Sequence, residues 1–353
     1  MTSRTSEITS SEIARQAGVS RATVSVVLSG TRSTSRVSDA TRQRVLAVAA
    51  ALGYAPHPVA RALRRQRTGV LGFIPRAHRT TLFDHPVPYL LGIALSRAAA
   101  AYGYQIVETT TDPAKAHDGD ELVRFMQQHR VDGIILDSPD TVAEVQRFIA
   151  HQIPLVQIIR PQPIKTARVT VDARPGITAA VAHLLEAGHR RIAWLGRGGE
   201  HPIDRARRAA FVAALDQHGL PCPAAWLREV AAYGVSEGYD SAMPLLAQPD
   251  RPTALIAMGD NIALGVLRAL YTLRLRVPDE FSLISYDDAF AGVLYPPLTS
   301  VAQPLTDVGA RAIAMLHEQI EGEPGTIAPR AETVPTDLII RESVAAPRGV
   351  WGE

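Results

Sequence analysis

Cysteine, lysine and long apolar runs are all scarce in this chain of 353 residues. Cys222, in a proline-flanked loop, is the single cysteine, which excludes an internal disulfide framework and a thiolate-rich metal site. No two histidines stand at the spacing of a metal-binding helix, so we expect neither a cofactor nor a metal. No apolar run reaches about 18 residues and the first ten residues are polar, which predicts no membrane span, no signal peptide and a cytoplasmic location.

Positive charge is concentrated near the N-terminus. Residues 1–67 contain 11 arginines, no lysine and three acidic residues, a net charge of +8, whereas the whole chain carries +2. A basic segment attached to a mildly acidic remainder indicates that this segment alone meets a polyanion. Lys115 and Lys165 are the only lysines, and such an arginine bias also fits a GC-rich genome. The charge therefore supports nucleic-acid binding without establishing it.

Three short helices are predicted within residues 9–53. Thr9 and Glu12 have the spacing of a capping box, which starts the first helix. Gly18 can take the positive φ of a tight turn, and Ser20 is a suitable N-cap for a second helix over residues 21–28. This spacing is typical of a helix-turn-helix, although three short helices around few apolar residues could also form an ordinary bundle.

Short motifs follow one another through this segment. They are Ile8-Thr9 with Glu12-Ile13-Ala14, Ala17-Gly18-Val19-Ser20, Ala22-Thr23-Val24-Ser25, Val27-Leu28-Ser29-Gly30, Val37-Ser38, Thr41-Arg42 and Leu52-Gly53-Tyr54. Together they closely resemble the head of the LacI/GalR family of repressors. The resemblance continues through residues 58–63, which look like the family's hinge segment, and along the remainder of the chain.

The resemblance implies that the second helix reads DNA. Arg21, Ala22 and Val26 match positions that face base edges in the major groove, where an arginine can donate two hydrogen bonds to guanine. A further group matches positions that hold phosphates: Thr9, Ser20, Thr23, Ser25 and Ser29. Val26 departs from the family, which commonly has arginine there, so the operator is expected to differ at that base pair.

In the hinge segment, the resemblance assigns DNA contacts to Val59, Ala60 and Leu63. The family's hinge folds into a helix only when two copies meet on DNA, and its leucine wedges into the minor groove. Leu63 could instead be a linker residue that packs on the following domain. Because one helix-turn-helix covers about one half-site, we expect a homodimer on a palindromic operator. The tail lacks the heptads of a tetramer-forming helix.

From residue 68 onward, short apolar runs alternate with helical periodicity. Strands are predicted at residues 69–74, 104–107, 133–136 and 155–159, and the pattern restarts at 168–171, 191–195, 254–257 and 281–285. Helical stretches such as 90–101 lie between them. Repeated β-α units with buried strands predict parallel sheets covered by helices on both faces, in two similar subdomains.

The expected fold is therefore an all-α helix-turn-helix head followed by an α/β body with two Rossmann-like subdomains. The head spans residues 1–56, the hinge 57–67, the effector-binding domain 68–345 and a tail 346–353. Likeness to periplasmic sugar-binding proteins implies three crossings between the subdomains, which we place near residues 165, 294 and 330. Subdomain one then holds 68–165 and 295–330, and subdomain two holds 166–294 and 331–345.

Two facing subdomains make a cleft at the carboxyl ends of their strands, where open parallel sheets bind ligands. The resemblance assigns effector contacts to Arg205 and Asp287, and a guanidinium can give two parallel hydrogen bonds to a sugar diol. The other candidates are Asp260, whose usual asparagine neighbour is Gly259 here, and Phe83, Asp137, Ser138 and Gln303. Each could instead be a capping or solvated residue. The expected effector is a sugar or a related metabolite.

Parts of the sequence also fit three other functions. Residues 234–238 fit the G-x-S-x-G pattern of a hydrolase, yet no oxyanion-type His-Gly-Gly segment precedes them, and Ser236 could equally cap a helix. Residues 196–199 lack the third spaced glycine of a nucleotide-binding loop. A secreted sugar-binding protein would need a signal peptide and would not explain the head. The sequence thus predicts no enzyme, but a transcription regulator whose operator affinity a small molecule controls.

Overall fold

The computed structural model describes residues 9–29, 37–52, 67–75, 86–109, 123–124, 128, 131–139, 141–198, 202–323 and 326–347. The chain divides into two compact units, Met1–Gly69 and Val70–Glu353. None of the helices in this described part is both long and apolar enough to cross a membrane.

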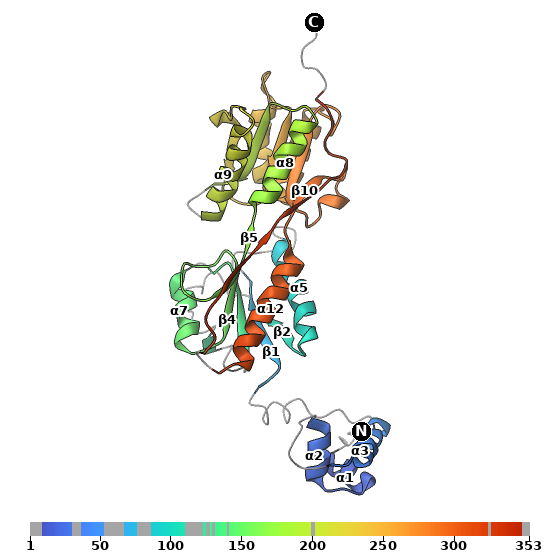
Figure 1. The fold of residues 1–353 in the computed structure, drawn as a ribbon. Helices are drawn as coiled ribbons and strands as arrows, with labels where there is room; N and C mark the ends of the chain where they lie inside the picture. Colours follow the sequence, from blue (N-terminus) through green and yellow to red (C-terminus); the bar gives the residue numbers. More distant parts are fainter. Residues whose placement is uncertain are drawn as a thin grey trace, which may run out of the picture. The chain divides into compact units, whose positions relative to one another are not determined.

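The first unit holds the predicted helices α1 (Ser10–Ala17), α2 (Arg21–Ser29) and α3 (Asp39–Ala51), drawn in blue in Figure 1. Each contributes a fully buried branched residue to a small core: Ile13, Val24 and Val45. Gly18 ends α1 with φ 65°, the left-handed conformation expected of the turn. Leu46, next to the buried Val45, is 46% exposed.

Side-chain caps begin two of these helices. The Ser20 hydroxyl accepts a hydrogen bond from the Thr23 amide at 3.1 Å, and Ser38 does the same for Thr41 at 3.3 Å. Each such cap stabilises its helix by about 1 kcal/mol. The capping box predicted at Thr9 is wrong. The Thr9 side chain makes no cap bond, and the Glu12 carboxylate pairs with Arg15 instead of reaching back to Thr9.

The second unit contains two six-stranded sheets. The first sheet is parallel throughout, in the order β11-β5-β4-β3-β1-β2. Its strands are β1 (Val70–Ile74), β2 (Gln105–Glu108), β3 (Gly133–Asp137), β4 (Leu155–Ile159), β5 (Ala167–Asp172) and β11 (Ala331–Pro335). Helices α5 (Val87–Ala101) and α12 (Leu305–Glu321) cover one face, and α7 (Val142–Ala150) covers the other (Figure 1).

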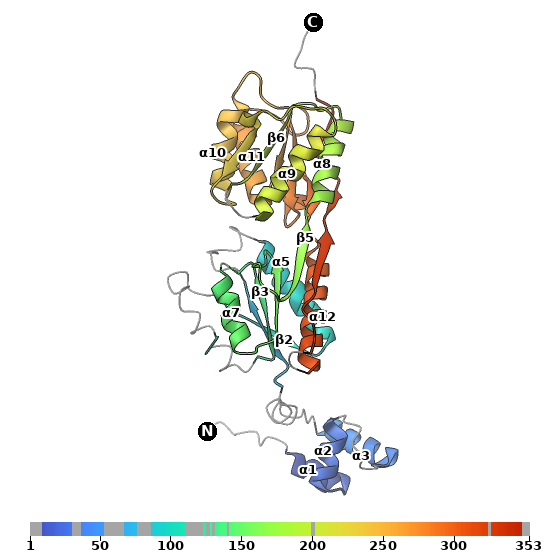
Figure 2. The same cartoon turned by 60° about the vertical axis from the view of Figure 1, so that its left-hand side comes forward.

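The second sheet repeats this arrangement in the order β12-β10-β9-β8-β6-β7 and is parallel except for β12. Its strands are β6 (Ile192–Arg197), β7 (Leu227–Val230), β8 (Ala254–Ala257), β9 (Ser282–Asp287), β10 (Thr299–Ala302) and β12 (Asp337–Ile339). Helices α8 (Arg174–Glu186) and α9 (Pro202–Asp216) lie on one face, and α10 (Val235–Leu246) and α11 (Asp260–Thr272) lie on the other (Figure 2). Short 3₁₀ turns occupy Ala224–Trp226 and Ala291–Val293.

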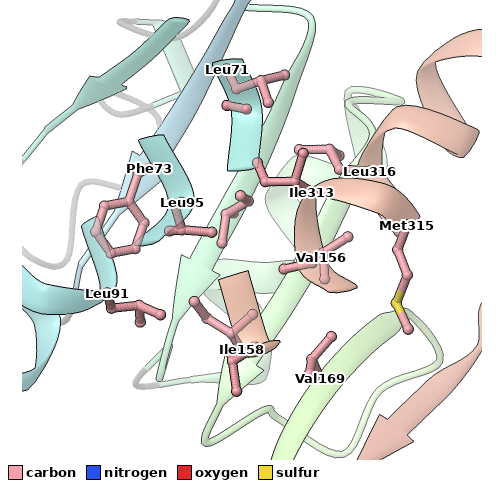
Figure 3. Packing of buried hydrophobic residues seen from close by; sticks show 14 of the residues in the cluster. Leu71, Phe73, Leu91, Leu95, Val156, Ile158, Val169, Ile313, Met315 and Leu316 are labelled. Carbon is pink, nitrogen blue, oxygen red and sulfur yellow. The ribbon is translucent and has the colours of Figure 1, made fainter. Parts of the chain in front are cut away.

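The core of the first subdomain lies between its sheet and the pair α5 and α12 (Figure 3). Leu71 and Phe73 of β1 and Leu95 of α5 are fully buried there, and Leu316 of α12 lies against them. Burying one such side chain stabilises the fold by about 1.5–3 kcal/mol. The strands are apolar on both faces, as parallel sheets require, because helices cover them on both sides.

Three crossings connect the subdomains, and all lie later in the chain than predicted. The chain crosses at residue 173 between β5 and α8, at 303–304 between β10 and α12, and at 336 between β11 and β12. Strand β5, predicted to open the second series, therefore pairs within the first sheet. The pairing partner of a strand lies far away in the sequence, so apolar periodicity alone does not reveal which sheet it joins.

The G-x-S-x-G segment serves helix packing. A Cβ on Gly238 would overlap the carbonyl oxygen of Ile262, and one on Gly265 would overlap that of Val235, so these glycines let α10 and α11 approach closely. Ser236 is exposed inside α10, and its predicted role as a helix cap is wrong because Gly234 occupies the N-cap.

Candidate functional site

A pocket lies between the two subdomains at the carboxyl ends of their strands. Its walls come from both sides: Val87, Pro88, Asp137, Ser138, Ile159, Arg160, Arg207, Tyr233, Asp287 and Gln303. The space among them, including the solvent at its open mouth, measures about 500 Å³. Both sheets have the doubly wound strand order in which ligands bind at this edge.

Strained backbone carries three of the pocket residues. Ser138, Ile159 and Asp287 have φ values of 51°, 62° and 95°, in the region that side-chain-bearing residues rarely adopt. Each residue ends a strand or directly follows one. Such conformations cost about 1–3 kcal/mol each and cluster at functional sites. The strained backbone therefore lies where the chain turns these residues toward the pocket.

Arg207 and Gln303 bring unsatisfied polar atoms to the pocket. Arg207 is 6% exposed, and its Cζ lies 4.3 Å from the ring centre of Tyr286. Among the described residues, its buried Nε has no hydrogen-bond partner. The buried Oε1 of Gln303 likewise has no partner within the part of the chain that the structure describes. A buried polar atom without a partner costs about 1–3 kcal/mol, so a ligand that binds both atoms gains that free energy.

Asp287 lies beside these groups. Its Oδ1 accepts a hydrogen bond of 2.5 Å from Nε2 of Gln303. Burial and the nearby charge of Asp260 raise the pKa of Asp287 to about 7, while Arg207 and the bond from Gln303 oppose that rise. The pocket thus combines a cation with a carboxyl group that titrates close to neutral pH.

A buried ion pair forms another wall. The guanidinium of Arg160, which follows β4, donates to both carboxylate oxygens of Asp204 on α9, at 2.9 and 2.7 Å. It also donates to the hydroxyl of Tyr233 at 2.9 Å, and that hydroxyl donates to Asp204 at 2.8 Å. Burial alone would raise the pKa of Asp204, but the bond and charge of Arg160 outweigh it and lower that pKa.

Several of the predicted effector residues meet in this pocket: Asp137, Ser138, Asp287 and Gln303. Asp260 does not line it. Its carboxylate is buried and accepts hydrogen bonds from the Ser285 hydroxyl and from the backbone amides of residues 289–291, so it holds the loop that follows Asp287. Phe83 lies outside the described residues.

The arginine assigned to the pocket differs from the one found there. Arg205 is exposed on α9, whereas Arg207, two residues later, lines the pocket. A signal was present in the sequence, because helical spacing places residue 207 on the same face as the buried Phe211 and Ala214. Arg160 and Tyr233 were also missed, since nothing local marks an arginine after a strand as a partner of a distant helix.

The residues of the head that were predicted to contact DNA lie on α2 and next to α1 and α2. Arg21 and Ala22 are exposed, and Thr23, Ser25 and Val26 are half-buried. The hydroxyls of Ser20 and Thr23 lie 2.9 Å apart at the start of α2, Thr9 precedes α1, and Ser29 ends α2. The hinge residues Val59, Ala60 and Leu63 lie outside the described residues.

Comparisons with known proteins cover both units. Residues 9–57 match the model of bacterial regulatory proteins of the lacI family, and residues 181–344 match the periplasmic binding protein-like domain. The regulator MalR of Streptomyces coelicolor is 33% identical over 97% of this chain and 98% of its own, and the repressor PurR of Mannheimia succiniciproducens is 30% identical over 94% and 97%.

Solved structures agree in fold. The lac repressor dimer bound to operator and the anti-inducer ONPF is 25% identical, with a TM-score of 0.76 over 96% of this chain and 99% of that one. The regulator CelR in complex with cellobiose is 28% identical, with a TM-score of 0.70 over 95% and 99%. These relatives are transcription regulators and not enzymes. The chain belongs to the LacI family of DNA-binding transcription regulators.

Proposed function

We propose that this regulator is a repressor that binds a palindromic operator as a homodimer and changes its DNA affinity when a sugar enters the pocket between the subdomains. The observation that carries the effector half is the pair of unsatisfied atoms, Nε of Arg207 and Oε1 of Gln303. One needs an acceptor and the other a donor. A hydroxyl group is both, so a polyhydroxylated ring offers a partner to each of the two atoms.

Relatives support this choice of effector. A solved relative, CelR, is described with cellobiose, and the lac repressor with the anti-inducer ONPF. The residues that we assign to the sugar are Arg207, Asp287, Gln303, Asp137 and Ser138, with Asp260 fixing the loop behind Asp287. In this proposal Arg207 takes the place first assigned to Arg205.

The DNA half of the proposal uses the exposed side of α2. Arg21, Ala22 and Val26 face bases, whereas Thr9, Ser20, Thr23, Ser25 and Ser29 hold phosphates. The hinge residues Val59, Ala60 and Leu63 contact DNA, and Leu63 enters the minor groove. Since the first 67 residues carry a net charge of +8, salt should weaken binding steeply.

Exposed apolar side chains support a homodimer. Tyr89 and Ile93 lie four residues apart on α5, and Val293 and Tyr295 are 84% and 94% exposed near the start of β10. We assign the homodimer contact to these side chains, since burying exposed apolar surface is favourable. A twofold contact through them would place two heads on the two half-sites of one operator.

Effector and operator are coupled because the sugar contacts both subdomains while the hinge precedes the first. A ligand shifts the DNA-binding equilibrium only by its difference in affinity for the two arrangements, typically about 1–3 kcal/mol. A change in the angle between the subdomains, with the pocket closed throughout, would alter the spacing of the two hinge segments.

The proposal is tested in two steps. Selection from a randomised DNA pool should return a palindrome, and a thermal-shift screen of sugars and nucleobases should return a sugar that changes the gel shift of that palindrome. A selected site without twofold symmetry would contradict the dimer, and stabilisation by nucleobases alone would contradict the sugar.

A further inference from the structure

The ion pair of Arg160 and Asp204 spans the two subdomains. Arg160 follows β4 of the first sheet, and Asp204 lies on α9 beside the second. Both residues are 6% exposed, and the bond is bidentate, with donor–acceptor distances of 2.9 and 2.7 Å. Tyr233, after β7, accepts from Arg160 and donates to Asp204, so the three side chains form a closed ring of hydrogen bonds.

The ring lies in the wall of the pocket. Arg160 and Tyr233 line the same space as Arg207 and Asp287, and Asp204 lies three residues before Arg207 on α9. The residues that join the subdomains through the backbone are at 173, 303–304 and 336. These crossings permit a hinge motion, whereas a bidentate ion pair on the pocket side resists opening.

We propose that Arg160, Asp204 and Tyr233 form a latch that holds the subdomains closed on the pocket before any effector binds. The latch deepens the proposed function, since it rests on this pocket being the effector site. A neutral sugar cannot replace either charge of the pair. The latch therefore stays closed around the bound sugar, and it preorganises Arg207 and Gln303 for it.

Removing one partner acts selectively on the closed arrangement. When the pocket is shut, the remaining charge is buried without compensation, which is strongly unfavourable, whereas in an open pocket water solvates it. Single substitutions should thus shift the population toward open molecules without unfolding either subdomain. Replacing both partners with apolar residues removes the buried charge altogether and should restore closure, because such exchanges are often neutral.

The test measures the distance between spin labels on the full-length protein, without DNA or sugar. Labels at the exposed positions Ala150→Cys, on α7, and Gln217→Cys, after α9, report the two subdomains in a Cys222→Ser background. Labelled chains are diluted with unlabelled ones, so that each dimer carries one labelled copy. We expect one short distance for this background, and a second, longer one for Asp204→Ala and Arg160→Met, with the open-to-closed ratio raised about tenfold or more.

Controls separate the latch from damage to α9. Arg208 on the same helix pairs with Glu229 inside the second subdomain, both half-exposed, so Arg208→Met must leave the distances unchanged. Tyr233→Phe keeps the ion pair and should open the protein less than Asp204→Ala. The double variant Arg160→Met with Asp204→Leu should return to the short distance.

Unchanged distances in both single variants would overturn the latch, as would opening by Arg208→Met. Since no sugar or operator is present, these outcomes are independent of the effector and DNA proposals. Failure of the thermal-shift screen would in turn contradict the sugar without touching the latch.

Discussion

Gln303 donates two hydrogen bonds to Asp287. Its side-chain Nε2 lies 2.5 Å from Oδ1, and its backbone nitrogen lies 3.2 Å from the carbonyl oxygen. Gln303 is also the residue at which the chain leaves the second subdomain, and its own carbonyl accepts from Leu305 at the start of α12. A ligand that moves Asp287 therefore acts directly on a crossing between the subdomains. The pocket and the hinge motion are thus linked through one pair of residues.

The raised pKa of Asp287, about 7, predicts a pH-dependent stability. In the unfolded chain the carboxyl has a pKa of about 3.9, so between these values the folded state holds an extra proton. The stability due to this group is present at low pH and is lost as the pH rises through about 7. The free energy of unfolding of Asp287→Asn should therefore rise relative to that of the wild type. The rise is up to about 1.4 kcal/mol for each pH unit between about 3.9 and 7. Denaturant unfolding at pH 5, 7 and 9 measures the difference, and a constant difference would refute the prediction.

Arg207→Ala should abolish the response to effector while leaving operator binding intact. Arg207 lines the pocket, and its Nε has no hydrogen-bond partner in the described ranges of the chain. Arg205→Ala is the matched control, because it removes the same charge from the exposed face of the same helix and should retain the response. Gel shifts with and without sugar compare the two variants. A response lost in Arg205→Ala but kept in Arg207→Ala would reverse the assignment.

Arg21→Ala should weaken operator binding by about 1–3 kcal/mol and relax the choice at one base pair, as loss of a base contact does. Arg15→Ala removes an equal charge from α1, where Arg15 pairs with Glu12, and should leave base preference unchanged. Binding to a panel of single-base operator variants distinguishes the two. Equal weakening of Arg21→Ala on every sequence would mean that Arg21 touches phosphate only.

Val26→Arg should move preference toward guanine at the base pair that position 26 faces. Valine offers only apolar contact, whereas arginine can donate to two acceptors on the guanine edge. Selection from a randomised operator pool is run on both proteins in parallel. The same motif from both would show that position 26 does not face a base.

Tyr295→Glu combined with Val293→Glu should convert the dimer to a monomer, since the charges would be buried in the proposed contact without partners. Ile149→Glu on α7 changes an exposed apolar residue elsewhere and should leave the mass unchanged. Sedimentation at micromolar concentration measures the mass of each variant. A dimer that survives the double substitution would place the contact on another surface.

Local chemistry determined much of the fold. Apolar runs located β4 at 155–159 and β8 at 254–257 to the residue, because buried parallel strands are rich in apolar residues. The Ser20 cap and the turn at Gly18 were likewise readable, since both depend on a few neighbouring residues. The head and its family were therefore evident from the sequence alone.

Tertiary structure decided the site. Arg160 and Asp204 are 44 positions apart, and only the assembly of the two subdomains brings them together. The same packing selects Arg207 over Arg205 for the pocket and turns Asp260 toward a loop instead of a ligand. Ion pairs and pocket walls form between side chains whose separation along the chain carries no periodic signal, so their partners emerge only once the sheets are assembled.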